Sequence, residues 1–133
     1  MTADAMAKAV KVAARITDTN PTPAMAEAGN YRKGKVRLHG MEIAIENPKG
    51  SIRSGTDKDG KPWRVTLPAH YGDIKRTEGA DGDPVDVYIG PDHSSRKVFV
   101  VDQIDAGSKR FDEHKALLGF PSKAAAVSTY TKA

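Results

Sequence analysis

Alternation of apolar and polar residues begins near residue 35, and this period of two restricts the fold more than any other feature of the chain. In KVRLHGMEIAIEN (35–47), two alternating runs are separated by His39 and Gly40. Successive side chains of an extended chain point to opposite sides, so each run predicts a strand with one buried face. Further runs of this kind are WRVTLP (63–68), VDVYIG (85–90) and KVFVVDQID (97–105). The last run is almost continuously apolar, which predicts a central strand.

The first 34 residues lack this alternation. Ala5 to Ile16 has the spacing of a short helix, and the two prolines of TDTNPTPA (17–24) end it, because proline cannot donate the helical hydrogen bond. We therefore expect residues 1–34 to be a helical appendage or linker. Residues 35–133 are expected to form one domain.

The C-terminal end of the chain is again helical in pattern, with Ser122 as a suitable N-cap for KAAAVSTYTK (123–132). Several short strands, few helices and turn signals such as Asp59-Gly60 predict an α+β fold that is mainly β. We expect a small twisted β-barrel, similar to OB folds, with the C-terminal helix packed on it. Trp63 is expected in the core, as is usual for a large aromatic residue on a strand.

The composition excludes several classes of protein. With 133 residues, of which 38% are hydrophobic and 29% charged, the chain has the size and polarity of one globular domain. There is no cysteine, so a disulfide scaffold is excluded and a cytoplasmic location is allowed. We expect no membrane-spanning segment. The net charge of +4 gives only weak support for nucleic-acid binding, because basic residues gather only in YRKGKVRLHG (31–40).

Three aspartates crowd into GADGDPVDVYIGP (79–91). On a regular strand Asp81 and Asp83 would share a face and Asp86 would point away, but a bend at Pro84 would bring all three together. Three carboxylates repel one another without a cation, and an all-oxygen set favours Mg²⁺, Mn²⁺ or Ca²⁺. An EF-hand does not fit, because the third acid falls at the position where that loop needs glycine. The alternative is a turn with solvated acids.

The segment DGDPVDV (81–87) resembles the signature of the soluble, Mg²⁺-dependent inorganic pyrophosphatases. Three other segments resemble further parts of that family: LPAHYGDI (67–74), IENPKGSIR (45–53) and VDQIDAGSKRFDEHK (101–115). More narrowly, the chain is similar to the pyrophosphatase-like module of phage and mobile-element polyvalent proteins. The resemblance covers roughly residues 42–120, and it implies that residues 35–133 are a pyrophosphatase-like β-barrel domain.

This resemblance implies Mg²⁺-dependent hydrolysis of inorganic pyrophosphate or a related phosphoanhydride, with Mn²⁺ as a possible substitute. The metal ligands that it implies are Asp81, Asp86, Asp105, Asp112 and Glu113. The catalytic residues that it implies are Asp83, as general base toward a metal-bound water, and Arg53, Tyr71 and Lys115, which would hold phosphate oxygens. From this reading the protein would act in the cytoplasm of a host cell or in a virion.

The chain also departs from the family pattern. Leu67 stands where a second tyrosine is usual, Gly55 stands near an expected acid, and Ala106 follows Asp105 in place of a second acid. The later helix of the family is represented at best by Tyr130 and Lys132. These departures keep an alternative open, namely a non-catalytic structural or DNA-associated module of a phage or mobile element. An oligomer is possible in either case.

Overall fold

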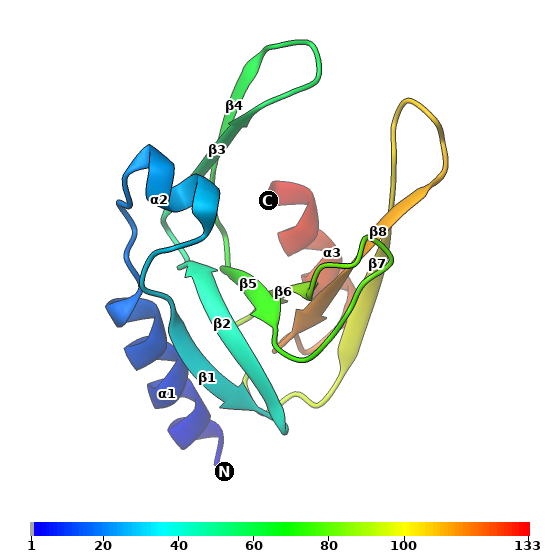
Figure 1. Ribbon diagram of the computed structural model, residues 1–133. Coiled ribbons are helices and arrows are strands. Elements are labelled where there is room, and N and C mark those ends of the chain that lie inside the picture. The colour runs from blue at the N-terminus through cyan, green and yellow to red at the C-terminus, as the bar shows by residue number, and fades with distance from the viewer. Residues whose placement is uncertain (1) are drawn as a thin grey trace.

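The structure is a computed structural model that describes residues 2–133 (Figure 1). Its helices are α1 (Ala3–Ile16), α2 (Pro23–Ala28) and α3 (Lys123–Lys132). Its strands are β1 (Gly34–Leu38), β2 (Met41–Asn47), β3 (Ile52–Thr56), β4 (Pro62–Thr66), β5 (His70–Ile74), β6 (Val85–Ile89), β7 (Val98–Ile104) and β8 (Phe111–Leu118). The predicted class, α+β and mainly β, is confirmed.

Six strands form one sheet in the order β1-β2-β5-β6-β8-β7, and β3 and β4 form a separate hairpin. All neighbours are antiparallel except β6 and β8, which are parallel. The sheet stays open rather than closing into the expected barrel, because β1 and β7 each have a strand on one side only. The prediction that residues 97–105 form a central strand was therefore wrong. The chain turns back after β7, and β8 takes the place between β7 and β6.

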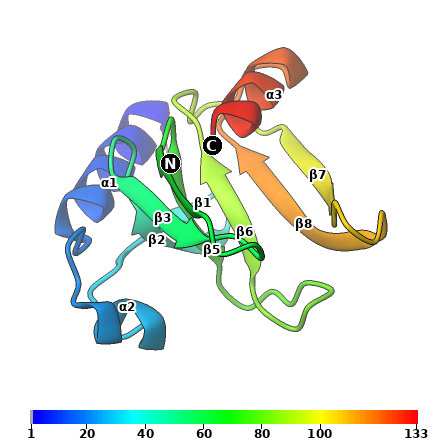
Figure 2. The same cartoon turned by 90° about the horizontal axis from the view of Figure 1, so that it is seen from above.

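One face of the sheet is covered by α1 and forms an apolar core (Figure 2). Three residues of α1 are buried there, namely Met6, Val10 and Ala13. They pack against strand residues that include Ile43 and Ile45, both 0% exposed. Predicted helix residues 5–16 lie within α1, so the helix is confirmed. The division into residues 1–34 and 35–133 stays a prediction. Because α1 contributes buried residues to the core, we expect its deletion to destabilise the domain.

A buried threonine joins the end of α1 to the sheet. The hydroxyl oxygen of Thr17 lies 3.1 Å from the carbonyl oxygen of Ile45 and accepts a hydrogen bond of 2.9 Å from the backbone N–H of Gly34. Gly34 itself leaves no room for a side chain, because a Cβ there would lie 1.8 Å from the carbonyl oxygen of Ala13. The helix and the first strand therefore touch through their backbones.

The opposite face of the sheet carries α3, whose N-cap is Ser122 as predicted, with its side chain accepting from the N–H of Ala125. A second apolar cluster forms here and includes Leu67, Tyr71, Tyr88, Leu117, Phe120 and Ala126. Trp63 belongs to neither cluster and is 40% exposed, so its predicted core position was wrong. It lies on the two-stranded hairpin, which has no second layer that could bury it.

The strands that alternation predicted are present, but β3, β5, β8 and the short α2 were not foreseen. In β5, Gly72 interrupts the apolar pattern because it lies against β2, where a Cβ would come within 1.8 Å of the carbonyl oxygen of Ala44. A close backbone approach of this kind can require glycine inside a strand, where glycine is otherwise unfavourable. Among residues 2–133, no helix is both long and apolar enough to cross a membrane.

Candidate functional site

The alternation of β6 separates apolar from polar side chains as the sequence predicted. Val87 and Ile89 enter the core under α1, while Asp86 and Tyr88 face the side of α3. Asp86 is paired in register with Asp73 of β5 on one side and with Lys115 of β8 on the other. These three ionisable side chains therefore form a row across neighbouring strands, and the row is the centre of the candidate site.

Lys115 holds this centre together. Its side chain is only 8% exposed, and Nζ lies 2.9 Å from Oδ2 of Asp86 and 3.2 Å from Oε1 of Glu113. The same Nζ donates a hydrogen bond of 3.0 Å to the hydroxyl of Tyr71. Burial alone would lower the pKa of Lys115, but the contacts with Tyr71 and Asp86 outweigh it and raise this pKa above its ordinary value. Lys115 is therefore a positive charge at neutral pH, held by three partners.

Tyr71 stands between two cations. Its ring lies 4.7 Å from the guanidinium of Arg53 on β3 and 5.2 Å from Nζ of Lys115. Burial raises the pKa of Tyr71, and the hydrogen bond from Lys115 offsets only part of this effect, so the phenol is neutral at pH 7. A cation over an aromatic face is stabilised by about 0.5–2 kcal/mol. This contact helps to hold the guanidinium of Arg53, which forms no ion pair with the described residues.

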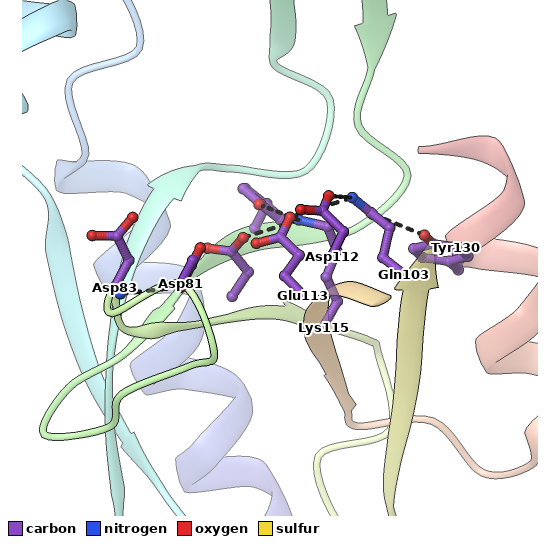
Figure 3. A network of polar contacts seen from close by, with 9 residues as sticks. Asp81, Asp83, Gln103, Asp112, Glu113, Lys115 and Tyr130 are labelled. Atoms are coloured by element: carbon purple, nitrogen blue, oxygen red, sulfur yellow. Dashed lines mark hydrogen bonds and ion pairs between the residues drawn. The ribbon is translucent and has the colours of Figure 1, made fainter. Parts of the chain in front are cut away.

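The row of polar groups continues toward α3 (Figure 3). Gln103 of β7 donates from Nε2 to Oε1 of Glu113 and to Oδ2 of Asp112, each at 3.3 Å. The hydroxyl of Tyr130 on α3 donates to Oε1 of Gln103 at 3.0 Å. Gln103 was missed from the sequence, because an isolated glutamine on an alternating strand gives no signal. Asp112, Glu113 and Lys115, by contrast, were named through the resemblance, and their roles stay predictions; Glu113 contacts Lys115, and Asp112 contacts Gln103.

Two further acids, Glu46 and Asp73, are half-buried and were given no role from the sequence. Burial raises the pKa of Glu46 on β2, and repulsion from Asp73 and Asp86 adds to the effect. Oδ1 of Asp73 is buried and accepts no hydrogen bond within the described chain, although Nζ of Lys75 lies 3.4 Å away, at ion-pair distance. That contact is too poorly aligned to count as a hydrogen bond, so we regard this oxygen as unsatisfied. Glu46 stands in the quoted segment IENPKGSIR, which could have drawn attention to it.

Among the described residues, the side chains of the two loop acids make no hydrogen bond or ion pair with Lys115, Asp86 or Glu113. Asp81 and Asp83 are exposed, and Oδ1 of Asp81 accepts a hydrogen bond of 3.1 Å from the N–H of Asp83. Asp86 is engaged by Lys115 instead. Within residues 2–133, no three His, Asp or Glu side chains are grouped closely enough to hold a metal ion. The convergence of Asp81, Asp83 and Asp86 on one cation therefore stays a prediction.

Asp105 lies in the turn between β7 and β8. Its Oδ2 accepts a hydrogen bond of 2.8 Å from the N–H of Ser108, and this backbone contact lowers the pKa of Asp105 below its ordinary value. The carboxylate is thus an anion with a role in closing the turn. Its predicted role as a metal ligand is not tested by this contact.

The donor atoms at the centre are nevertheless of the type that a hard cation prefers. Asp73, Asp86, Glu46 and Glu113 offer carboxylate oxygens, and Mg²⁺ is bound by oxygen in proteins. The unsatisfied, buried Oδ1 of Asp73 is an acceptor that a nearby cation would satisfy. The residues therefore fit a divalent metal in chemistry, although Lys115 neutralises part of their charge.

A cleft of about 500 Å³ opens above this centre, between the β3–β4 hairpin and the end of α3. Residues that line it include Arg53, Trp63, Arg64, Gln103, Lys115 and Tyr130. Arg53, Arg64 and Lys115 carry permanent or stabilised positive charge, and Lys115 also pairs with the carboxylates of Asp86 and Glu113. The three cations attract an anionic ligand to such a cleft. A ligand with more than three negative charges would need a metal ion to neutralise the rest.

Comparison with models of protein families gives a match. The sequence model of a protein family described as Inorganic Pyrophosphatase matches residues 23–133. No curated protein and no solved structure matches the chain. The matched range begins at α2, contains every predicted site residue and leaves out α1.

Proposed function

The chain belongs to the inorganic pyrophosphatase family, and we propose that it hydrolyses inorganic pyrophosphate, or a related phosphoanhydride, with the help of Mg²⁺. The observation that carries this proposal is a cleft lined by Arg53 and Lys115, in which Lys115 also contacts Tyr71 and the carboxylates of Asp86 and Glu113. Pyrophosphate resists attack because it is anionic, so its hydrolysis requires positive groups that neutralise it.

In this proposal the cationic groups bind the phosphates. Lys115 and Arg53 attract the phosphate oxygens, and the neutral hydroxyl of Tyr71 can donate a hydrogen bond to one of them. The pairing of Lys115 with Asp86 and Glu113 keeps its ammonium in place before the substrate arrives. Positive charge fixed in advance is effective in catalysis, because it needs no reorganisation when negative charge develops on the leaving phosphate.

The resemblance implies Asp81, Asp86, Asp105, Asp112 and Glu113 as the metal ligands, with Mn²⁺ as a possible substitute. Of these five, Asp86 and Glu113 belong to the donor set beside Lys115 whose chemistry fits a divalent metal. A bound Mg²⁺ would supply further charge neutralisation and make water easier to deprotonate. Asp83 would accept the proton of the attacking water as general base. Its exposed position on the loop leaves it accessible to water.

The test is phosphate release from pyrophosphate, measured with and without Mg²⁺ together with the melting temperature. We expect Mg²⁺ to raise the melting temperature by linkage and to be required for turnover. Asp83→Asn should lower turnover by roughly two to four orders of magnitude while the Mg²⁺-induced shift survives. Asp81→Asn should weaken both. Near wild-type turnover in Asp83→Asn would refute the role of general base.

One observation favours a second candidate. Lys115 already pairs with Asp86 and Glu113, and no metal-binding trio is preformed among residues 2–133. A non-catalytic module of a phage or mobile element, present in the cytoplasm or carried in a virion, would need no more than this fold. It would give no phosphate release at any Mg²⁺ concentration, and binding to DNA fragments would then be the next measurement.

A further inference from the structure

The cleft lined by Arg53 and Lys115 has an aromatic wall that has no role in the proposed hydrolysis of inorganic pyrophosphate. Trp63 lies on β4, in the hairpin that projects beyond the main sheet (Figure 1). Its side chain is 40% exposed and lines the cleft together with Arg53 and Lys115. Leaving a tryptophan ring this exposed forgoes much of its hydrophobic stabilisation, so the core does not explain its position.

The hairpin holds this ring in a defined position. Gly55 is the register partner of Trp63, and a Cβ at Gly55 would come within 2.6 Å of the indole atom Cζ2. The ring therefore packs against bare backbone, which only glycine allows. Gly55 also stands near a position where the family resemblance implies an acid.

Arg53 connects this aromatic surface to the phosphate-binding groups. Its guanidinium lies 5.6 Å from the centre of the Trp63 ring and 4.7 Å from the centre of the Tyr71 ring. Tyr71 in turn contacts Lys115. The cleft therefore presents cations at its base and a planar aromatic surface beside them, within one continuous hollow.

We propose that the phosphoanhydride bound in this cleft carries a nucleobase, which stacks on Trp63 while its phosphates contact Arg53 and Lys115. This proposal rests on the proposed function for the position of the phosphates. Every nucleobase offers a π face, so stacking on tryptophan accepts many bases. The volume of about 500 Å³ also falls within the 300–1,000 Å³ range typical of pockets for drug-sized ligands, which are far larger than pyrophosphate.

The test compares two ligands with the same number of phosphates. Trp63 is the single tryptophan, so quenching of its fluorescence reports the ring directly, and calorimetry gives the dissociation constants. With Mg²⁺ present, the full-length protein should bind ATP about tenfold or more tightly than inorganic tripolyphosphate. Only ATP should strongly quench the indole emission.

Substitutions in the β3–β4 hairpin test whether Trp63 causes the preference for ATP over tripolyphosphate. Trp63→Leu should abolish the advantage of ATP and leave the affinity for tripolyphosphate unchanged, while Trp63→Phe should keep part of the advantage. Gly55→Ala should also reduce it, because the added methyl group displaces the ring. Ile52→Ala is the matched control, since Ile52 is 49% exposed on the same hairpin and does not line this cleft. It should leave the ratio of affinities unchanged.

The possible failures are distinguishable. Equal affinity for ATP and tripolyphosphate in the wild-type protein would overturn the nucleobase site and leave pyrophosphate hydrolysis intact. An advantage for ATP that persists in a folded Trp63→Leu protein would also overturn it. Tight, Trp63-dependent binding of ATP without phosphate release from ATP or pyrophosphate would support the nucleobase site and refute the hydrolase. Binding of neither ligand would overturn both.

Discussion

The two faces of the six-stranded sheet are built from the same strands and have opposite character. On the side of α1, the buried residues are apolar, and Ile43, Ile45 and Val87 are each 0% exposed. On the side of α3, an apolar cluster gives way to the row of charged and amide groups around Lys115. In β6 the two sets alternate residue by residue, with Val87 next to Asp86.

This contrast indicates how the small domain divides its tasks. The α1 face supplies stabilisation by removing apolar area from water, at about 25 cal/mol per Å². The Lys115 face has a cost, because an unsatisfied Asp73 oxygen and the crowded Glu46 both oppose folding in the absence of a ligand. Mutations on the first face should therefore change stability alone, while those on the second should change the response to Mg²⁺ as well.

The largest effect should come from removing α1. Deleting residues 1–20 takes Met6 and Val10 out of the core and uncovers Ile43 and Ile45. Each buried side chain of this size contributes about 1.5–3 kcal/mol, so the loss should exceed about 5 kcal/mol and approach the stability of an average domain. Urea unfolding followed by circular dichroism measures it.

Two single substitutions in α1, one at a buried and one at an exposed valine, serve as controls for the deletion. Val10→Ala should destabilise, because Val10 is 2% exposed, whereas Val12→Ala should have little effect, because Val12 is 48% exposed. A deletion variant that unfolds cooperatively at the wild-type urea midpoint would show that residues 1–34 are an appendage, as the sequence predicted, and would break the comparison between the faces.

The next largest effect should follow Lys115→Met. Removing the ammonium leaves Asp86 and Glu113 facing each other without a counter-charge, and since both are about one-quarter exposed, we expect a loss of about 2–3 kcal/mol. Millimolar Mg²⁺ should recover part of this loss, because the cation replaces the missing charge. Ile45→Ala should be destabilised to a similar extent, with no recovery. Recovery in both variants, or in neither, would contradict the division between the faces.

The smallest effect should be a gain in stability. The pKa of Glu46 is raised by burial and by Asp73, so its favourable contribution is complete below its ordinary pKa of 4.5 and is lost as pH rises through the folded value. Glu46→Gln should therefore raise the melting temperature by a few degrees at pH 7 without metal, and this gain should vanish below pH 4. Mg²⁺ at pH 7 should favour the wild-type protein. A gain that is the same at both pH values would exclude ionisation as its cause.

Local sequence patterns predicted which side chains of a strand point to the same face, but they did not predict the order of the strands in the sheet. The alternation in residues 85–89 correctly separated Val87 from Asp86, because the direction of a side chain on a strand is a local property. The position of β7 at the edge could not be read in this way, since it depends on the insertion of β8. Partners distant in sequence decide that order.

The site shows the same limit. Lys115, Asp112 and Glu113 were predicted as site residues through the resemblance, whereas Asp73 was overlooked because its environment comes from β6. Trp63 was misassigned because nothing in WRVTLP indicates that its strand lies in a hairpin without a covering layer. Burial and charge environment follow from tertiary contacts, and those are not visible in one segment at a time.

The parallel pairing of β6 and β8 also has a consequence for the order of folding. The β7–β8 hairpin can form from neighbouring residues, but Asp86 meets Lys115 only when that hairpin docks on β6. Contacts between distant segments are made late, because the chain must first lose the entropy of the long loop between them. We therefore expect ligand binding to return with the slowest kinetic phase of refolding, after most of the secondary structure has already formed.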